Sequence, residues 1–237
     1  MQLSDVPVVI LAGGRGTRLG ALASDLPKAL VPVAGRPFVD HQLALLKRNG
    51  IRQVVFCVGH LGDLIEAHLG DGRQLGLRIS YSYDGDRLLG TGGALRQALP
   101  RLGPLCLVLY GDSYLDIDYG AILDHFELCP ELGLMTVFRN DGRWDTSNVA
   151  FQDGRLLRYN KRQPDPAMAY IDYGASLFRA TALERIPSNE PYDLGDLTHT
   201  LAAEGLLAGY EVTQRFYEVG SFGGIRETER YLLEHTL

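Results

Sequence analysis

Short apolar runs alternate with amphipathic segments along the first part of the chain. Continuous apolar runs favour buried strands, and apolar residues spaced three and four apart favour helices. Strands are predicted over residues 6–12, 52–59, 77–83 and 105–112. Helices are predicted over residues 38–50, 61–70, 91–102 and 118–129. Strands that alternate with helices are typical of a parallel sheet covered on both faces, with the carboxyl ends of its strands along one edge.

From Gly133 onward, strand-like segments alternate between apolar and polar residues and are separated by turn residues. Antiparallel or mixed strands are predicted over residues 134–139, 148–161 and 169–178, and helices over 193–205 and 222–235. The second of these segments contains Gln-Asp-Gly-Arg, which is a hairpin signal. We therefore expect an α/β fold, a three-layer sandwich with a mainly parallel Rossmann-like sheet. A mainly β part would lie beside the same sheet edge as a lid, with no clean domain boundary.

Composition and charge exclude several classes of protein. The 237-residue chain has a formal net charge of −6, so we expect no nucleic-acid partner. Its three cysteines, Cys57, Cys106 and Cys129, are unclustered and lack metal-ligand spacing, which suits a reducing compartment. We see neither a signal-peptide pattern nor a membrane span. The expectation is a cytoplasmic protein without a membrane partner.

One stretch at the end of the first predicted strand favours phosphate binding. Residues 8–30 read VVILAGGRGTRLGALASDLPKAL. The glycines that let backbone amides approach an anion are Gly13, Gly14 and Gly16. The cations that follow are Arg15, Arg18 and Lys28. The spacing departs from the dinucleotide loop at Leu19 and lacks the Gly-Lys of a P-loop. On the glycines alone, a tight turn with surface arginines is an equal alternative.

The longer pattern around this stretch is Gly-Gly-x-Gly-Thr-Arg-Leu, followed by Pro-Lys-x-Leu-x-Pro-Val-x-Gly-x-Pro. It resembles the signature of the sugar-1-phosphate nucleotidylyltransferases. The resemblance continues in order through GTGGALRQAL, LVLYGDSYL, RYNKRQP, IDYGASLF and RFYEVGSFGGIRETERYL, and so covers nearly the whole chain. It implies transfer of a nucleoside monophosphate from a nucleoside triphosphate to a sugar 1-phosphate, with release of pyrophosphate.

The resemblance also implies a domain organisation. Residues 1–237 would form a single nucleotidyltransferase domain. Residues 1–132 would bind the nucleotide, and residues 133–237 would bind the sugar phosphate and supply the C-terminal helix. Members of the family often assemble as dimers or tetramers, so a homo-oligomer is a possible state that the sequence leaves open.

Roles at the reacting centre follow from the same resemblance. The catalytic residues implied are Arg18, on the departing pyrophosphate, Lys28, at the reacting phosphate, and Asp112. Asp112 ends a buried strand, where its carboxylate suits Mg²⁺, the expected cofactor; an N-cap is its alternative role. Glu218 stands where the family usually has Asp and is the expected second metal ligand. The nucleotide-binding residues implied are Ala12, Gly13, Gly14, Arg15, Gly16, Thr17, Arg18, Gly90 and Thr91.

The expected sugar-phosphate site comes from the second half of the chain. Lys161 matches the family lysine that meets the sugar phosphate, and Asn160 replaces the neighbouring glutamate. Gly174 and Asp172 fall in the next matching segment, where the family has Asn in place of Asp172. Asp172 would accept hydrogen bonds from sugar hydroxyls or pair with a cation structurally, and the sequence leaves both open. Trp144 is expected to pack rather than to stack on a sugar.

The base and the sugar are open at this stage. Asp84 and Asp86 lie just before Gly90, and an acceptor-only carboxylate matches the N1–H and N2–H₂ donors of guanine. An exposed turn is their alternative role. The chain most resembles heptose- or mannose-1-phosphate guanylyltransferases, which implies GTP. Cytidylyl or uridylyl transfer to phosphocholine or an amino-sugar 1-phosphate is an alternative, with Asp172 and the aromatic residues Tyr159, Tyr170 and Tyr173 available. A non-catalytic regulatory subunit is another.

Overall fold

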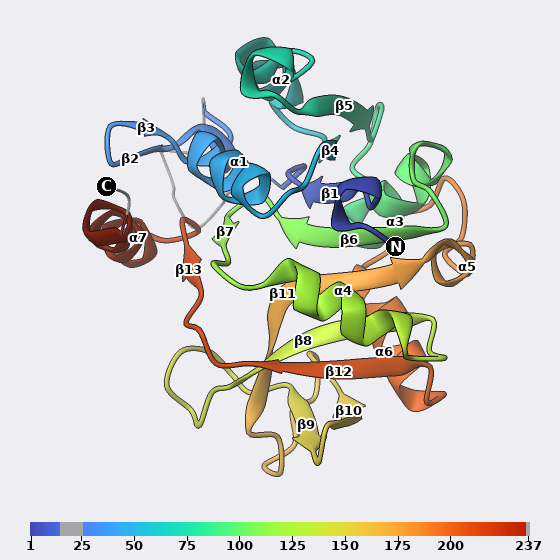
Figure 1. Ribbon diagram of the computed structural model, residues 1–237. Coiled ribbons are helices and arrows are strands. Elements are labelled where there is room, and N and C mark those ends of the chain that lie inside the picture. The colour runs from blue at the N-terminus through green and yellow to red at the C-terminus, as the bar shows by residue number, and fades with distance from the viewer. Residues whose placement is uncertain (15–25, 236–237) are drawn as a thin grey trace.

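Strands from both halves of the chain form one nine-stranded sheet (Figure 1). The computed structural model describes residues 1–14 and 26–235. Four strands run parallel in the order β5-β4-β1-β6. They are β1 Val8–Leu11, β4 Gln53–Val58, β5 Arg78–Tyr83 and β6 Leu105–Tyr110. Each corresponds to a predicted strand, and the expected α/β fold with a mainly parallel central sheet is confirmed.

The second half of the chain extends this sheet. Its strands are β8 Gly133–Arg139, β9 Val149–Gln152, β10 Arg155–Tyr159, β11 Tyr170–Arg179 and β12 Leu207–Val212. β11 pairs antiparallel with β6, β8 pairs antiparallel with β11, and β12 pairs parallel with β8. The mainly β part therefore continues the central sheet rather than only lying beside its edge, because β11 is hydrogen-bonded directly to β6. β12 was not predicted.

Helices cover both faces of the sheet (Figure 1). On one face lie α1 Phe38–Arg48, α2 Gly62–Leu69 and α4 Tyr119–Glu127. On the other face lie α3 Gly90–Ala98, α5 Ala180–Leu183 and α6 Leu194–Ala203. Aspartates begin two of these helices, since Asp118 accepts the amide of Ala121 and Asp193 accepts the amide of Gly195. The arrangement gives the expected three layers.

The two hydrophobic cores follow from the period of two along each strand. In β1, Val8 and Ile10 pack with α1 and α2, whereas Val9 and Leu11 pack with α3 on the opposite face. Because both faces of β1 are buried, its sequence is continuously apolar rather than alternating. This burial is why the strand could be recognised from a short apolar run.

Short elements complete the chain. A third hydrophobic cluster joins α7 Phe222–His235 to residues beside β2 Pro32–Val33 and β3 Arg36–Pro37. β7 Ser113–Tyr114 pairs antiparallel with β13 Tyr217–Glu218. Single 3₁₀ turns are η1 Leu3–Asp5, η3 Lys28–Leu30, η4 Arg73–Leu75 and η5 Leu99–Arg101. Among the described residues, no helix has the length and apolar character needed to cross a membrane.

Two local features shape the second half. The β9–β10 hairpin turns through Asp153 and Gly154, which have φ of 50° and 76°, as the Asp-Gly signal predicts. In β11, the pairing with β8 is interrupted between Asp172 and Ser176 by a bulge. Gly174, inside this bulge, has φ of 102°, which glycine adopts without strain. The bulge redirects the strand beside the carboxyl end of β6.

Candidate active site

A pocket of about 230 Å³ opens at the carboxyl ends of the parallel strands. Binding at this edge is the general expectation for an open α/β sheet. Its lining residues come from the ends of β1, β4, β5 and β6 and from the start of α3: Leu11, Ala12, Gly13, Gly14, Lys28, Ala29, Cys57, Asp84, Leu88, Gly90, Thr91, Ala94, Tyr110, Gly111 and Asp112. The pocket thus collects most of the described residues that were predicted to bind the nucleotide.

Backbone hydrogen bonds fix the turn after β1. The amide of Ala12 donates to Cys57 O at 2.8 Å. A Cβ on Gly13 would lie 3.2 Å from the backbone nitrogen of Gly59, so the two strand ends approach too closely for an easy substitution. The predicted residues Arg15, Gly16, Thr17 and Arg18 lie outside the described residues. Their roles therefore stay predictions.

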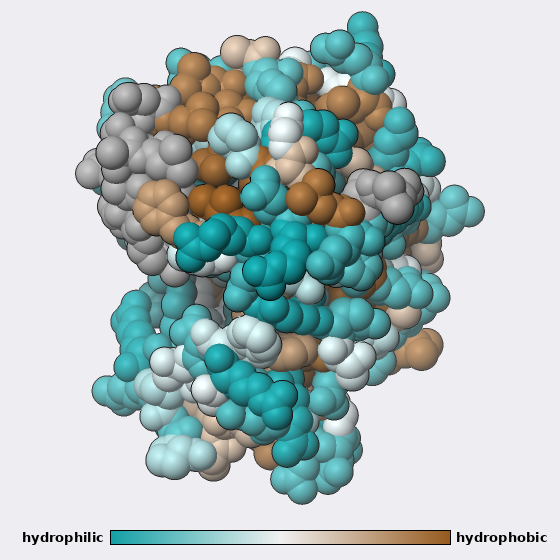
Figure 2. Space-filling model, turned by 90° about the vertical axis from the view of Figure 1, so that its left-hand side faces the viewer, coloured by the Kyte–Doolittle hydropathy of each residue, from teal (hydrophilic) through white to brown (hydrophobic). Residues whose placement is uncertain are grey.

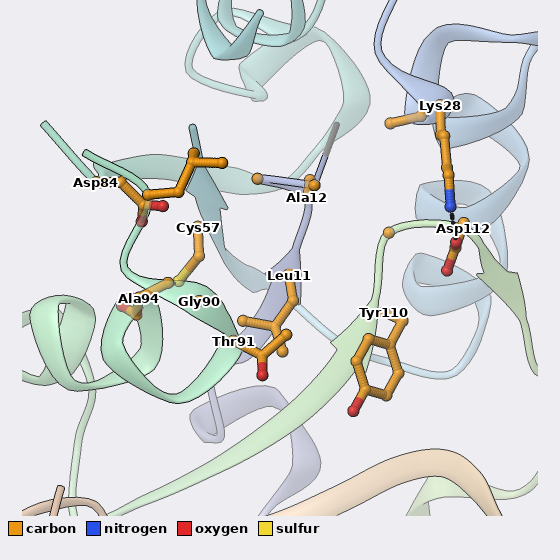
Figure 3. A pocket seen from close by; sticks show the side chains of 15 residues that line it. Leu11, Ala12, Lys28, Cys57, Asp84, Gly90, Thr91, Ala94, Tyr110 and Asp112 are labelled. Atoms are coloured by element: carbon orange, nitrogen blue, oxygen red, sulfur yellow. Dashed lines mark hydrogen bonds and ion pairs between the residues drawn. The ribbon is translucent and has the colours of Figure 1, made fainter. Parts of the chain in front are cut away.

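Lys28 and Asp112 form an ion pair on one side of the pocket (Figure 3). The Lys28 ammonium donates to Asp112 Oδ2 at 2.7 Å, and the two side chains are 19% and 24% exposed. Partial burial makes such a pair stronger than one at the surface. Asp112 does not cap the following helix, since Asp118 does so. Two residues predicted at the reacting centre are therefore in direct contact.

Gln42 supports this pair from beneath and was not predicted. Its side chain is buried on α1, and its amide donates to Tyr110 O at 2.9 Å and to Ser113 O at 2.8 Å. These two carbonyls bracket Asp112, so Gln42 holds the loop that carries the carboxylate. A glutamine on the otherwise apolar stripe of the helix over residues 38–50 was the available signal.

The backbone of Glu218 is paired with the strand that follows Asp112, but the Glu218 side chain is hydrogen-bonded to other residues. The amide of Val219 donates to Asp112 O at 2.9 Å. The Glu218 carboxylate accepts from the amide of Gly220 at 2.5 Å and from Ser221 Oγ at 2.6 Å. It is therefore bound to the turn that leads into α7. Each oxygen keeps a further lone pair, and the predicted role of Glu218 as a metal ligand stays a prediction.

Asp84 lies on the opposite side of the pocket from Lys28, beyond Leu11 and Ala12 (Figure 3). Its Oδ2 accepts the amide of Leu89 at 3.0 Å, and burial raises the pKa of the carboxyl. Asp86 does not line this pocket and instead borders a separate depression beside His60. Only one of the two predicted base-contacting aspartates is thus brought to the site.

The start of α3 is tied to the start of α6. Gly92 and Gly93 donate their amides to Tyr192 O, and Thr91 Oγ1 accepts the amide of Leu194 at 2.9 Å. The Thr91 hydroxyl lies 3.3 Å from Asp193 Oδ1. Asp193 was not predicted. It joins the pocket at the strand ends to the second half of the chain.

The predicted sugar-phosphate residues gather around the β11 bulge and the end of β10. Asn160 Oδ1 accepts the amides of Arg162 and Gln163 at 3.0 and 2.9 Å, so it forms a turn. Lys161 is exposed on this turn, and its positive charge lowers the pKa of Asp172. Arg162 points elsewhere, into an ion pair with Asp196 at 2.7 Å. The charge of Lys161 thus reaches Asp172, and the role of both residues in binding a sugar phosphate stays a prediction.

Asp172 is a partly buried carboxyl held by the bulge. Its Oδ1 accepts the amide of Gly174 at 3.0 Å, and its own amide donates to Asn148 Oδ1 at 3.0 Å. Burial raises the pKa of Asp172 to about 6, against the opposing effects of the Gly174 hydrogen bond and the Lys161 charge. Among the described residues it forms no ion pair, so the structural alternative is not supported.

The remaining aromatic candidates do not converge on Asp172. Tyr173 packs with Phe138 and Phe216, and Tyr170 packs with Phe151. The guanidinium carbon of Arg215 lies 3.8 Å from the centroid of the Trp144 ring, in agreement with a packing role for Trp144. Tyr173 lies inside the bulge itself, so the packing of its ring, rather than its position in the chain, separates it from Asp172.

The two ends of the molecule differ in surface character. On the face shown in Figure 2, hydrophobic residues gather in the upper part, over the first half of the chain. The lower part, formed by the second half of the chain, is mainly hydrophilic there. This agrees with a first pocket lined largely by apolar and backbone atoms and a second site built from polar side chains.

Comparison with known proteins identifies the family. Residues 7–148 match the nucleotidyl transferase family, and this chain belongs to it. An N-acetylmuramate alpha-1-phosphate uridylyltransferase of Caulobacter vibrioides is 30% identical over 92% of this chain and 94% of its own length. A D-glycero-alpha-D-manno-heptose 1-phosphate guanylyltransferase of Campylobacter jejuni is 36% identical over 61% and 64%. The match to a mannose-1-phosphate guanylyltransferase of Mycobacterium tuberculosis, 31% identical, spans 79% of this chain and only 52% of that protein.

Solved structures agree on the fold. The inositol-1-phosphate CTP transferase of T. maritima superimposes with a TM-score of 0.80 at 20% identity, over 99% of this chain and 97% of that one. HddC of Yersinia pseudotuberculosis, complexed with GMP-PN, superimposes with a TM-score of 0.78 at 19% identity, over 96% and 99%. The nucleotidyltransferase fold expected from the sequence is confirmed.

Proposed function

We propose that this protein transfers a nucleoside monophosphate from a nucleoside triphosphate to a sugar 1-phosphate and releases pyrophosphate. The observation that carries the proposal is the Lys28–Asp112 pair at the mouth of a strand-end pocket. Two phosphorylated substrates must meet there, and a cation between them would reduce the repulsion between their negative charges. The names of the family's characterised members agree with this class of reaction.

The reaction is an in-line displacement at the α-phosphorus. An oxygen of the sugar 1-phosphate forms the new P–O bond, and the bond to the pyrophosphate leaving group breaks. The protein contributes positioning and charge rather than covalent chemistry. Lys28 would stabilise negative charge on the α-phosphoryl oxygens, and Asp112 orients its ammonium. Lys161 would hold the acceptor phosphate from the other side.

We further propose Mg²⁺ as the cofactor, held by Asp112. A carboxylate at the mouth of the pocket is the hard oxygen ligand that this ion prefers. The described residues contain no cluster of three acidic, histidine or cysteine side chains, so phosphate oxygens of the substrates would complete the ligand set. Bound there, the ion would neutralise phosphate charge. Glu218 is the second proposed ligand, through the lone pairs that Gly220 and Ser221 leave free.

For the donor we propose GTP and for the acceptor heptose or mannose 1-phosphate. Asp84 lines the pocket opposite the reacting centre, and its acceptor-only carboxylate matches the donors of guanine. Relatives named as guanylyltransferases act on these sugars. UTP is the second candidate, because the relative matched over nearly its whole length is named a uridylyltransferase.

The test is pyrophosphate release by the purified chain with Mg²⁺. GTP, UTP, CTP, dTTP and ATP are each combined with a panel of sugar 1-phosphates, and with phosphocholine as the non-sugar acceptor. We expect turnover with one donor and a small group of acceptors. Absence of turnover in every combination would contradict the enzymatic function and favour a regulatory subunit.

The role of Asp84 has its own measurement. Asp84→Asn keeps the acceptor for the Leu89 amide but adds a donor, so we expect at least a tenfold loss of GTP selectivity over UTP. Asp86→Asn, outside the pocket, is the matched control. If the selectivity for GTP over UTP were the same in both variants, Asp84 would have no role in base recognition.

A further inference from the structure

We propose that a depression between α1 and α2 binds an organic phosphate that carries an apolar ring. The depression has a volume of about 370 Å³ and is lined by residues of β3, α1, α2, η4 and the turn before β5. It shares no described lining residue with the pocket at the strand ends. The inference therefore goes beyond the proposed function, because the ligand would be neither the donor nor the acceptor of that reaction.

The floor of the depression is apolar. Leu43, Leu69 and Leu77 line it and belong to the hydrophobic core of this face of the sheet, so packing fixes their positions. Ala44 and Leu75 add apolar surface that is exposed or partly exposed to solvent. A ring that covered this surface would remove it from water, which is favourable. Apolar walls with a few polar groups are typical of small-molecule sites.

The charged groups around this floor favour an anion. Arg36 and Lys47 both line the depression, and neither forms an ion pair in the part of the chain that the structure describes. Asp40 is the one acidic residue among the described lining residues, and His68 Nε2 lies 2.8 Å from its Oδ1. Positive charge therefore exceeds negative charge here, although the whole chain has a formal net charge of −6. A local positive potential attracts anionic ligands.

Arg36 is held in place by a neutral side chain. His41 is 5% exposed, and its Nε2 donates to Val33 O at 2.8 Å. The other ring nitrogen, Nδ1, is therefore the acceptor for Arg36 Nη2 at 3.0 Å. Burial lowers the pKa of His41, against the opposing effect of the hydrogen bond to Val33. The guanidinium is thus oriented by an uncharged ring, and its own charge is left for a ligand.

These features define the chemical class of the ligand. The fork of an arginine matches the oxygens of a phosphate group, with which it forms charge-assisted hydrogen bonds. The apolar floor matches a ring attached to that phosphate. Inorganic phosphate lacks the ring, and an uncharged ring lacks the anion, so each would lose one of the two contributions.

The experiment is a calorimetric titration of the full chain with 1-naphthyl phosphate, which combines an apolar ring with a phosphate. We expect saturable binding with a Kd below about 1 mM. Inorganic phosphate and 1-naphthol are the matched ligands, and each should bind at least tenfold more weakly. Absence of saturable binding would overturn the inference, and so would equally tight binding of 1-naphthol.

Two variants locate the bound ligand. Arg36→Gln removes the oriented charge, and Gln74→Trp places a large ring at the edge of the depression. Both residues are exposed, so the fold should be retained, and thermal unfolding checks this. Each variant should raise the Kd of 1-naphthyl phosphate at least tenfold. An unchanged Kd in both variants would overturn the inference.

Two further variants serve as controls. Arg101→Gln removes the same charge from η5, outside the depression, and should leave the Kd unchanged. Lys28→Ala removes the cation of the pocket at the strand ends and should also leave the Kd unchanged. Loss of binding in the Lys28 variant would place the phosphate in that pocket and would overturn the inference. Because the readout is binding rather than turnover, the result does not depend on the proposed function.

Discussion

Two regions of the proposed active site differ in the groups that line them. We call the pocket at the strand ends the nucleotide side, and the region around the β11 bulge and the end of β10 the acceptor side. The nucleotide side uses strand ends, glycines and apolar atoms, and its charged groups Lys28 and Asp112 satisfy each other. The acceptor side uses side chains, and its carboxyl Asp172 is partly buried, has a raised pKa and forms no ion pair among the described residues. Uncompensated groups reduce stability unless a ligand completes them. Under the proposed function, the chemistry would reside in the first side and the selectivity in the second.

The largest expected effect concerns the charge pair on the nucleotide side. Lys28→Ala should lower kcat at least a thousandfold, about 4 kcal/mol, since it removes the cation and leaves Asp112 beside the phosphates. Pyrophosphate release under saturating substrates measures this. Lys47→Ala, at the far end of α1, is the control and should retain activity. Full kcat in the Lys28 variant would contradict the proposed position of the reacting centre.

The next effect concerns Asp172 on the acceptor side. Because its folded pKa of about 6 is above that of an unfolded aspartate, its ionised form destabilises the fold above pH 6. Asp172→Asn should therefore raise the free energy of unfolding by about 1–3 kcal/mol at pH 7.5. The gain should shrink as the pH falls from 6 and disappear below about pH 4.

Urea denaturation of the ligand-free protein at several pH values gives this measurement. Asp124→Asn, an exposed position on α4, serves as the control. A pH-independent change, or a loss of stability at pH 7.5, would contradict the view that the acceptor side carries uncompensated charge.

A smaller effect should arise beneath the nucleotide side. Gln42→Met leaves two buried carbonyls, Tyr110 O and Ser113 O, without their donor, which should cost about 1–3 kcal/mol of stability. If Gln42 also positions Asp112, kcat should fall while the KM of the acceptor stays constant. Gln97→Met is the comparison, since that amide is exposed. Equal stability of both variants would show that this loop is held by other contacts.

The smallest expected effect lies at the surface of the acceptor side. Arg215 stacks on Trp144, 3.8 Å from the ring centroid, and pairs with Glu227 of α7. Arg215→Gln should cost roughly 0.5–1 kcal/mol, because the contacts are partly exposed. The fluorescence of Trp144, the only tryptophan in the chain, should respond to the change. If Arg215→Gln lost more stability than Gln42→Met, the contacts at the surface of the acceptor side would matter more for stability than those beneath the nucleotide side.

The sequence predicted the nucleotide side better than the acceptor side, for a physical reason. Lys28 and Asp112 belong to contiguous motifs at the ends of apolar strands, and topology then brings strand ends together. Gln42 and Asp193 contact distant segments of the chain, and no local sequence pattern encodes such contacts. Closeness in sequence does not guarantee a place in the same pocket. Asp86 is two residues from Asp84 but borders another depression.

The same reasoning explains the strand that was missed. β12 contains Gly209, and a Cβ there would lie 2.6 Å from a ring atom of Phe151. Its glycine is required by the aromatic ring packed on it rather than by its own backbone. A glycine within a short run reads as a turn, so only the tertiary packing reveals the strand.

The bulge in β11 makes the acceptor side separable in protein engineering. Residues 175–179 are paired in register with β6 and belong to the nucleotide side. Tyr170, Ile171 and Asp172 are paired with β8 beyond the bulge, under an independent register. Residues exchanged or inserted before Gly174 would therefore re-aim the acceptor contacts while leaving the strand ends of the nucleotide pocket in place. The fold offers a point of exchange at which a transferase could be given a new acceptor without rebuilding its donor chemistry.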